Sequence, residues 1–429
     1  MRNLEKELDE ALKKVRVIDP HCHLGMQKPS ADNLADILLY HHLWIELISS
    51  GMGQYEVTTS GLPQELEAAE MDPLERVKRA LKYLPNIENT TVGLFLRWIL
   101  KDLYAVETLS EKNLKEVWDK VAIKAKDPSW SDEVLWNRCG IAYSISVEPQ
   151  GAPYSGRLLK GRQVYVMNLA DGKKTASEVL LGWEKILGRE IRKARDYQEL
   201  LSKIAASIHA DEYKFIGLSV LPGIRCESTS EKLITNIIGK IKKKKSLSEE
   251  ETGAFCYFGA CTFLDLLRKT PLRLVQLVVG AEVLLPHRSI THWHGNFPPA
   301  LARIASTYED FHFDISTASD TYTQDLGILA KHIPNLSLSG YWWHTLYPFY
   351  IKKAIETRLD MVPVNKIIAF FSDAYHAEWC YPKLKLVKQI VKQVLLERVE
   401  REWYTLDSAL EVIQKIFYEN PKRIYNIVE

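Results

Sequence analysis

The chain has 429 residues, with 56 Lys or Arg against 55 Asp or Glu and a formal net charge of +1. Balanced charge argues against a nucleic-acid partner, which favours a basic protein, and the absence of a run of about 18 apolar residues argues against a membrane span. Six scattered Cys without a CxxC pair predict reduced thiols. The N-terminus MRNLEKELDEALKKV is amphipathic and lacks the apolar stretch of a signal peptide. Together these features predict a soluble, cytoplasmic protein.

Eight short apolar, β-branched runs alternate with helical patterns along the chain. They span residues 15–19, 140–147, 163–169, 214–220, 272–280, 311–316, 336–342 and 367–373. Most are almost continuously apolar, which is typical of strands buried on both faces of a parallel sheet. Because helix-like sequence follows each run, the chain is predicted to be an α/β protein with a (β/α)8 TIM barrel. A doubly wound open sheet is the alternative.

Two intervals are too long for simple crossovers between strands. Residues 30–136 separate the first two strands and 227–270 separate the fourth from the fifth, and both contain helical patterns. The second interval carries IKKKKSLSEEE, in which four lysines beside three glutamates are more often a solvated helix end than a nucleic-acid patch. We therefore predict one barrel domain over 1–429 with helical insertions at 30–136 and 227–270. The last residues are predicted to form a helix pair with Asn420-Pro421 between the two helices.

The residues most indicative of chemistry are His21 and His23, directly after the first strand. The carboxyl ends of barrel strands form the active-site face, and residues two apart in extended chain point the same way, so both can bind one metal ion. Two neighbouring surface histidines are the alternative. Cys22 between them is predicted to fill the core.

Asp373 follows the eighth strand in the sequence IIAFFSDA. Strands one and eight are neighbours in a closed barrel, which places Asp373 beside the two histidines; the alternative is an Asp that caps the next helix. Two histidines and one carboxylate with open coordination positions suit a catalytic metal. The sequence thus predicts one divalent metal ion, Zn or Mn, bound by His21, His23 and Asp373.

At these motifs the chain resembles uronate (glucuronate) isomerases, a family of the amidohydrolase superfamily of metal-dependent barrels. The resemblance rests on DPHCHL, NLADILLYHHLWIELISSG, SGYWWHTLYP, FFSDAYHAEW and ENPKRIYNI and spans nearly the whole chain. It implies a TIM barrel of the metal-dependent hydrolase type and a reaction that interconverts aldo- and keto-hexuronates, such as glucuronate and fructuronate. In that reaction a proton moves between C1 and C2.

The resemblance also implies roles for residues of this chain. His21 and His23 would be metal ligands and Asp373 a ligand or proton carrier. His41 and His42 would reach the substrate pocket from the first insertion, with catalytic roles. The other expected substrate-binding residues follow strands four, seven and eight: Arg225, Trp343, His344 and Tyr375.

Several positions depart from the family pattern. The family continues its strand-eight motif as Asp-Ser/Ala-Arg, where this chain has Tyr375, and Ser319 and Asn168 stand near two further family arginines. The pocket Tyr of the family becomes His42. Since Arg is the natural bidentate partner of a carboxylate, these changes predict weak hexuronate binding.

The departures leave rival functions open. A metal-dependent hydrolase or decarboxylase acting on a less anionic substrate is the main alternative, and an inactive barrel that serves as an interaction partner is opposed by the intact His-His-Asp set. The expected partner is a small-molecule sugar acid or related polyol; a homo-oligomer is left open. His292 and His294, in the loop after strand five, could bind metal or sugar or lie on the surface.

Overall fold

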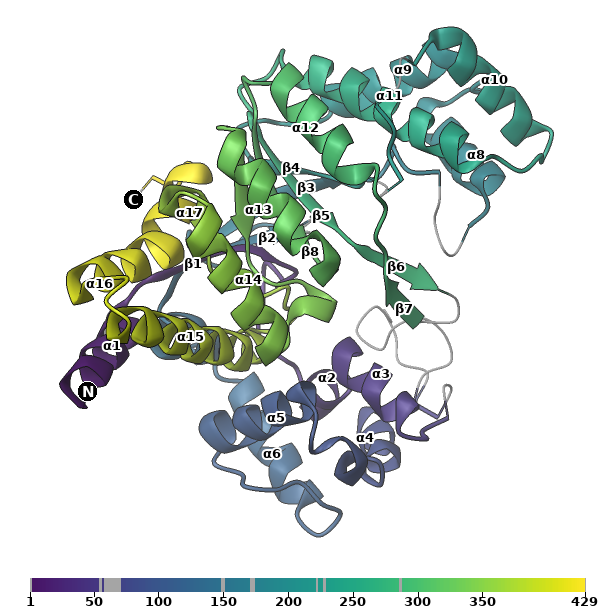
Figure 1. The fold of residues 1–429 in the computed structure, drawn as a ribbon. Coiled ribbons are helices and arrows are strands. Elements are labelled where there is room, and N and C mark those ends of the chain that lie inside the picture. The colour runs from purple at the N-terminus through teal and green to yellow at the C-terminus, as the bar shows by residue number, and fades with distance from the viewer. Residues whose placement is uncertain are drawn as a thin grey trace. The chain divides into compact units, whose positions relative to one another are not determined.

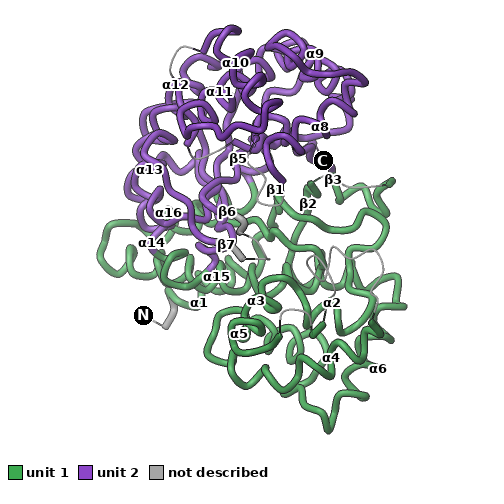
Figure 2. The backbone as a smooth tube through the Cα atoms, turned by 90° about the vertical axis from the view of Figure 1, so that its right-hand side faces the viewer, with its two compact units in different colours: residues 1–159, 347–352, 370–418 green, residues 160–346, 353–369, 419–429 purple. Residues whose placement is uncertain are grey.

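The structure is a computed structural model that describes residues 2–53, 56–57, 71–147, 151–169, 174–220, 223–226, 229–284 and 288–428. The chain divides into two compact units (Figure 2). Unit 1 comprises residues 1–159, 347–352 and 370–418, and unit 2 comprises residues 160–346, 353–369 and 419–429. The single domain over 1–429 stays a prediction.

Eight strands form one sheet in the order β1-β2-β3-β4-β5-β8-β9-β10, and the strand pairs within each unit are parallel. The strands are β1 (Val17–Cys22), β2 (Ile141–Val147), β3 (Leu158–Val164), β4 (Tyr213–Leu218), β5 (Leu274–Val279), β8 (His312–Thr317), β9 (Leu336–Ser339) and β10 (Ile367–Ile368). Figure 1 labels all of them except β9 and β10. Parallel strands in chain order are the arrangement of a (β/α)8 barrel. The predicted α/β TIM-barrel class is confirmed.

The third strand differs from the prediction. It was expected at residues 163–169, but β3 begins at Leu158 and ends at Val164. The apolar residues that follow are buried without continuing the strand, since Val166 is 6% exposed and Met167 is fully buried. The Val166 carbonyl accepts a hydrogen bond from the Tyr197 hydroxyl (2.7 Å), so this run is anchored as a buried loop.

Unit 1 contains the N-terminal helix, the insertion after β1 and two of the last helices. Helices fill most of the described residues from 30 to 136, as the sequence predicts. The helices of the unit are α1 (Arg2–Lys14), α2 (Leu34–Leu38), α3 (His41–Ser49), α4 (Pro73–Leu81), α5 (Thr91–Trp98), α6 (Leu114–Ala125), α7 (Trp130–Asp132), α15 (Ala377–Glu400) and α16 (Leu406–Gln414). Helix α14 (Pro348–Met361) begins in unit 1 and continues in unit 2.

One buried carboxylate joins the insertion to α15. Glu378, in the first turn of α15, is fully buried. Its carboxylate accepts hydrogen bonds from the Ala31 amide (3.0 Å), the Tyr104 hydroxyl (3.0 Å) and the Trp130 indole (2.9 Å). A buried charge is tolerated when it is hydrogen-bonded in this way. Three separate parts of the insertion therefore depend on one side chain of α15.

Unit 2 contains the helices α8 (Ala176–Leu187), α9 (Ala194–Ala206), α10 (Glu231–Lys242), α11 (Glu249–Leu267), α12 (Phe297–Thr307), α13 (Thr323–His332) and α17 (Asn420–Ile424). The lysine run is exposed between α10 and α11, and Ser248 and Glu251 form a capping box at the start of α11. This confirms a solvated helix end. Among the described residues no helix combines the length and hydropathy that crossing a bilayer requires.

Two features of unit 2 differ from the prediction. Asn420-Pro421 lies within the first turn of α17 rather than between two helices, and the Asn420 amide donates to the Val364 and Ile367 carbonyls (2.7 and 2.8 Å). An antiparallel hairpin of β6 (Ala281–Leu284) and β7 (Arg288–Thr291) follows β5 where a loop was expected. Gly280 opens it at φ +89°, and a Cβ there would lie 2.7 Å from the Thr317 hydroxyl.

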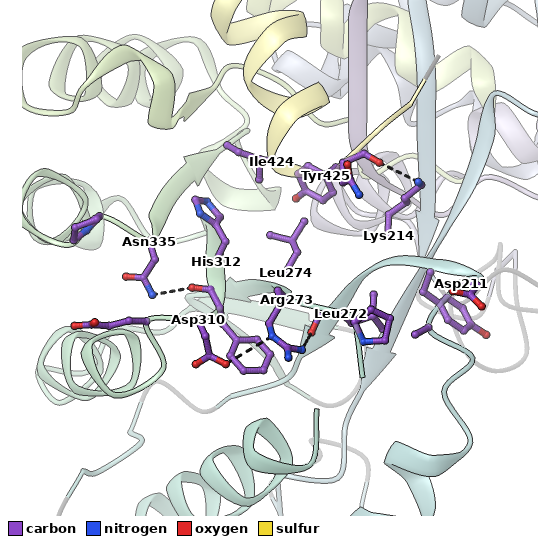
Figure 3. A pocket seen from close by; sticks show the side chains of 17 residues that line it. Asp211, Lys214, Leu272, Arg273, Leu274, Asp310, His312, Asn335, Ile424 and Tyr425 are labelled. Atoms are coloured by element: carbon purple, nitrogen blue, oxygen red, sulfur yellow. Dashed lines mark hydrogen bonds and ion pairs between the residues drawn. The ribbon is translucent and has the colours of Figure 1, made fainter. Parts of the chain in front are cut away.

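A cavity of about 670 Å³ opens in unit 2 at the amino ends of β4, β5 and β8 (Figure 3). Three of its charged lining residues are paired: Lys214 donates to the Asn426 carbonyl (3.1 Å), and Arg273 lies 3.7 Å from the Asp310 carboxylate. Barrel enzymes carry their active sites at the carboxyl ends of the strands. The cavity therefore lies at the wrong end for the chemistry that the sequence predicts.

Candidate metal centre

The candidate centre consists of His21, His23 and Asp373, all in unit 1. His21 belongs to β1 and His23 follows it directly. The segment that continues β10 runs alongside β1, because the Asp373 amide donates to the His21 carbonyl (2.9 Å) and the His23 amide donates to the Ala374 carbonyl (2.8 Å). The main chain thus brings the two ends of the sequence together at the carboxyl end of β1.

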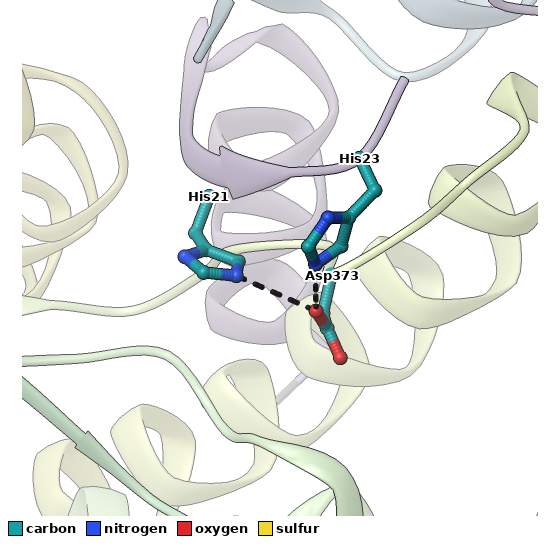
Figure 4. A group of neighbouring side chains, drawn as sticks. All are labelled: His21, His23 and Asp373. Atoms are coloured by element: carbon teal, nitrogen blue, oxygen red, sulfur yellow. Dashed lines mark ion pairs between the residues drawn. The ribbon is translucent and has the colours of Figure 1, made fainter. Parts of the chain in front are cut away.

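The three side chains converge on a common point (Figure 4). Nε2 of His21 lies 3.5 Å and Nε2 of His23 lies 3.2 Å from Oδ1 of Asp373, and one ligand atom from each residue lies within 4.8 Å of the others. Two ligands bound about 2.0–2.1 Å from a tetrahedral zinc ion lie about 3.3 Å apart. The donor set therefore fits a divalent ion with three protein ligands and an open position. No other such group occurs in the part of the chain that the structure describes.

The charge state of Asp373 suits a metal ligand. Burial raises the pKa of its carboxyl, but hydrogen bonds from His21 and His23, with their positive charge, outweigh burial and hold the pKa well below its usual range. A metal-binding carboxyl must be ionised. Asp373 is ionised at neutral pH before any ion arrives.

Three residues at the centre have no role in the sequence-based prediction. Asp19 is fully buried and accepts both the Ser372 amide (2.8 Å) and the Ser372 hydroxyl (2.6 Å). Burial raises the pKa of Asp19 to about 6, although these hydrogen bonds oppose the rise. Tyr40 and Lys383 contact the Asp373 carbonyl. Only Asp19 carries a sequence signal, as an acidic residue that closes an apolar run.

The predicted residues His41, His42 and Tyr375 lie at the centre. His41 and His42 begin α3 and are each 7% exposed. The Tyr375 ring stacks on His23 (centroids 4.6 Å apart, 13° between planes) and meets His41 edge-on at 5.5 Å. Burial lowers the pKa of His41 to about 3. The carboxylate of Asp373 opposes this shift, and the positive charges of Lys383 and His23 add to it. The His41 imidazole is therefore neutral at physiological pH.

The other predicted residues lie in unit 2. The Trp343 ring stacks on His344 (centroids 5.0 Å apart), and burial lowers the pKa of His344. Arg225 donates to the Glu250 carboxylate (3.0 Å), so its charge is paired with α11. His294 lies 3.6 Å from the Glu249 carboxylate. Their roles toward substrate stay predictions.

Comparison with known proteins finds no family model and no curated protein that match the chain. Solved structures do match. Uronate isomerase from Thermotoga maritima is similar with a TM-score of 0.80 at 14% identity, covering 99% of this chain and 97% of that one. Glucuronate isomerase from Caulobacter crescentus is similar with a TM-score of 0.81 at 16% identity, covering 100% and 95%.

A third solved structure is similar to a lesser degree. A metal-dependent hydrolase, so described provisionally, from Lactobacillus casei has a TM-score of 0.60 at 12% identity and covers 98% of this chain and 97% of that one. At these identities the likenesses establish the fold, which is the barrel of the uronate isomerases over the whole chain.

Proposed function

We propose that the chain is a metal-dependent aldose–ketose isomerase of the uronate isomerase type, which moves a proton between C1 and C2 of a sugar acid. The observation that carries the proposal is the convergence of His21, His23 and Asp373, in a fold shared with uronate and glucuronate isomerases. The position of His41 and Tyr375 supports it further, because the Tyr375 ring stacks on His23 and contacts the His41 ring edge-on.

A bound Zn²⁺ or Mn²⁺ would polarise adjacent substrate oxygens and so acidify the C2 proton. His21 and His23 would hold such an ion as neutral imidazoles, and Asp373 would hold it as a carboxylate. The proton leaving C2 passes to Asp373 or to His41, which is neutral and able to accept it, and returns to C1. His42 lies beside His41 (ring centroids 4.1 Å apart) and is the second candidate for this work.

The preferred substrate is proposed to be less anionic than a hexuronate. Tyr375 presents a phenol ring stacked on His23 where the resembling family carries an arginine. A phenol cannot form the bidentate, charge-assisted pair that a guanidinium forms with a carboxylate. The same difference supports the second candidate function, a metal-dependent hydrolase or decarboxylase, which the hydrolase-like neighbour also fits. There Asp373 would take the proton from water.

A substrate screen in D₂O separates these functions. The protein loaded with Zn²⁺ or Mn²⁺ is offered glucuronate, galacturonate, the corresponding neutral aldoses and the lactones, and proton NMR follows deuterium entry at C1 of the ketose and at C2 of the re-formed aldose. Deuterium entry with ketose formation supports the isomerase, and lactone opening or CO₂ release without it supports the alternative. The His21→Ala/His23→Ala protein is the control and should be inactive in every arm. A hexuronate kcat/KM of about 10⁴ M⁻¹s⁻¹ or more would show that the missing arginines are unnecessary.

A further inference from the structure

We propose that Tyr40 and Lys383 are positioning residues of the metal centre, which fix the main chain of Asp373 so that its carboxylate points at the two histidines. The inference rests on the proposed metal function and adds to it a pair of residues that touch no ligand atom of the ion. Neither residue belongs to the predicted site.

The contacts are direct and all lie in unit 1. The Tyr40 hydroxyl donates to the Asp373 carbonyl (2.9 Å). The Lys383 ammonium donates to the Tyr40 hydroxyl (3.0 Å), the Ser372 carbonyl (2.7 Å) and the Asp373 carbonyl (3.3 Å). Both side chains are almost completely buried, Tyr40 at 0% and Lys383 at 1% exposure. Two carbonyls in a row are therefore held by one buried ammonium and one buried hydroxyl.

A lysine at this place needs a reason, because burying an ammonium is unfavourable unless hydrogen bonds replace its water. An apolar side chain of similar length would fill the same space without that penalty. The oxygens that Lys383 contacts are main-chain carbonyls and a hydroxyl, and two of the three belong to the loop that carries Asp373. The main contacts of the buried ammonium are therefore with the loop that carries Asp373.

The loop needs holding because Asp373 has an unusual main-chain conformation. Its φ is +48°, in the left-handed region that residues with a side chain rarely adopt. Such a conformation persists only where the surroundings impose it. The Asp373 amide is tied to the His21 carbonyl (2.9 Å) and its carbonyl to Tyr40 and Lys383, so both peptide planes are fixed. With both planes fixed, the direction of the Cα–Cβ bond that carries the carboxylate follows, and the contacts with His21 and His23 set the rest.

The loop is also held from the side of β1. Asp19 accepts the Ser372 amide and hydroxyl, so Asp19 secures one side while Tyr40 and Lys383 secure the other. Tyr40 also stacks on Trp379 of α15 (centroids 4.4 Å apart, 19° between planes). Because Tyr40 immediately precedes α3, the same residue sets both the Asp373 loop and the start of the helix that carries His41.

If Lys383 only stabilised the fold, replacing it would lower the melting temperature and leave metal affinity unchanged. The chain offers a matched control for that case. Lys366 is another buried lysine, 7% exposed, whose ammonium donates to the Ala330 and Ile333 carbonyls in unit 2. Lys366→Met removes a buried ammonium from carbonyl oxygens as Lys383→Met does. It should lower the melting temperature without changing metal affinity.

The experiment titrates the chelator-stripped protein with Co²⁺ and records the visible absorption of the bound ion, with Zn²⁺ competition for affinity. We expect Tyr40→Phe and Lys383→Met to weaken Co²⁺ binding about 10–100-fold, the usual effect of removing a group that orients a ligand, and to alter the Co²⁺ spectrum. Lys383→Arg, which keeps the donors, should recover most of the affinity, and Lys366→Met should bind as the wild type does. Melting followed by circular dichroism shows which variants are folded.

Affinity and spectrum unchanged in folded Lys383→Met or Tyr40→Phe protein would overturn the positioning role. Tyr40→Phe removes a single hydroxyl, so it decides the question if the lysine variant does not fold. A wild-type protein that takes up no Co²⁺ would overturn the metal centre itself, and the positioning role with it. The two failures are thus distinguishable.

Discussion

His21, His23 and Asp373 are the three candidate protein ligands of one metal ion, so removing two of them should abolish binding. We expect the His21→Ala/His23→Ala protein to lose the roughly one equivalent of Zn²⁺ or Mn²⁺ that the wild type holds, because one carboxylate alone binds such ions weakly. Elemental analysis after gel filtration measures the content. His332→Ala, at an exposed position of α13, is the matched control. Unchanged metal content in the double variant would rule the centre out.

Under the proposed function, we expect Tyr375 to influence whether the enzyme prefers an anionic or a neutral substrate. Tyr375→Arg should shift preference toward hexuronates over neutral aldoses, because one charge-assisted hydrogen bond contributes about 1.5–3 kcal/mol, or roughly tenfold per 1.4 kcal/mol. The ratio of kcat/KM for glucuronate and glucose reports this. Tyr375→Phe keeps the ring that stacks on His23 and removes only the hydroxyl. A ratio that moves equally in both variants would mean that the guanidinium gains nothing here.

His312 predicts how stability depends on pH. It lines the cavity of unit 2 and contacts the Ser337 hydroxyl (2.9 Å), which donates to Asp314 (2.6 Å). Burial lowers the pKa of His312 to about 4. The charge of Asp314 opposes this shift, and the charges of Arg423 and Lys366 add to it. The unfolded chain, with an ordinary His pKa near 6.5, therefore binds more protons between pH 6.5 and 4. Stability from this residue is complete above pH 6.5 and is lost as the pH falls to 4, by at most about 3 kcal/mol.

Urea unfolding of the wild type and of His312→Gln at pH 7, 5 and 4 checks this expectation. The variant should lose less free energy of unfolding on acidification than the wild type. Asp19 acts in the opposite direction, because its raised pKa makes the folded chain bind more protons between pH 3.8 and 6. Because Asp19 is present in both proteins, its contribution cancels when the loss of unfolding free energy in the variant is subtracted from that in the wild type. Equal losses in both would refute the role of His312, and His332→Gln should behave as the wild type.

At the scale of elements, Glu378 links three parts of the insertion to α15. Glu378→Ala leaves three buried donors without their acceptor, and each unsatisfied group costs about 1–3 kcal/mol. We expect the free energy of unfolding to fall by at least about 3 kcal/mol, measured by chemical denaturation. Glu400→Ala, on the exposed face of the same helix, should change it by no more than about 0.5 kcal/mol. Similar losses in both variants would show that the buried hydrogen bonds of Glu378 contribute nothing beyond the charge of an exposed glutamate.

The elements also show what sequence patterns can and cannot predict. Long apolar runs located β1, β2 and β5, because burial on both faces leaves a strong signal. The prediction placed β3 at the apolar run 163–169, which is wrong because a buried loop can have the same composition as a strand. The four-residue strands β6 and β7 are too short to show a period.

The same contrast holds within the site. The ligands follow from the order of strands in a barrel, and so His21, His23 and Asp373 could be predicted together. The role of Lys383 could not be predicted, because α15 contains several lysines and such lysines usually lie on a solvent-exposed helix face. Its burial depends on Tyr40 and on the Asp373 loop, which lie far away in the sequence.

For the whole molecule, metal binding should raise thermal stability. The ligands come from β1 and from the segment after β10, so a bound ion links the two ends of the sequence. An ion at 100 times its Kd stabilises the folded state by about 2.7 kcal/mol. Scanning calorimetry with Zn²⁺ and with a chelator should show this as a higher Tm for the wild type and no shift for His21→Ala/His23→Ala. An equal shift in both would place the ion elsewhere.

The candidate ligands come from segments far apart in the sequence, so they are synthesised at different times. Asp19 and Ser372, which bond to each other at the centre, are 353 residues apart. At ribosomal speeds of about 5–20 residues per second, the histidines emerge about 20–70 s before Asp373 is synthesised. A nascent chain, or one terminated before Asp373, therefore carries only two of the three candidate ligands. Metal loading at the complete three-ligand site would therefore follow synthesis of the segment that carries Asp373.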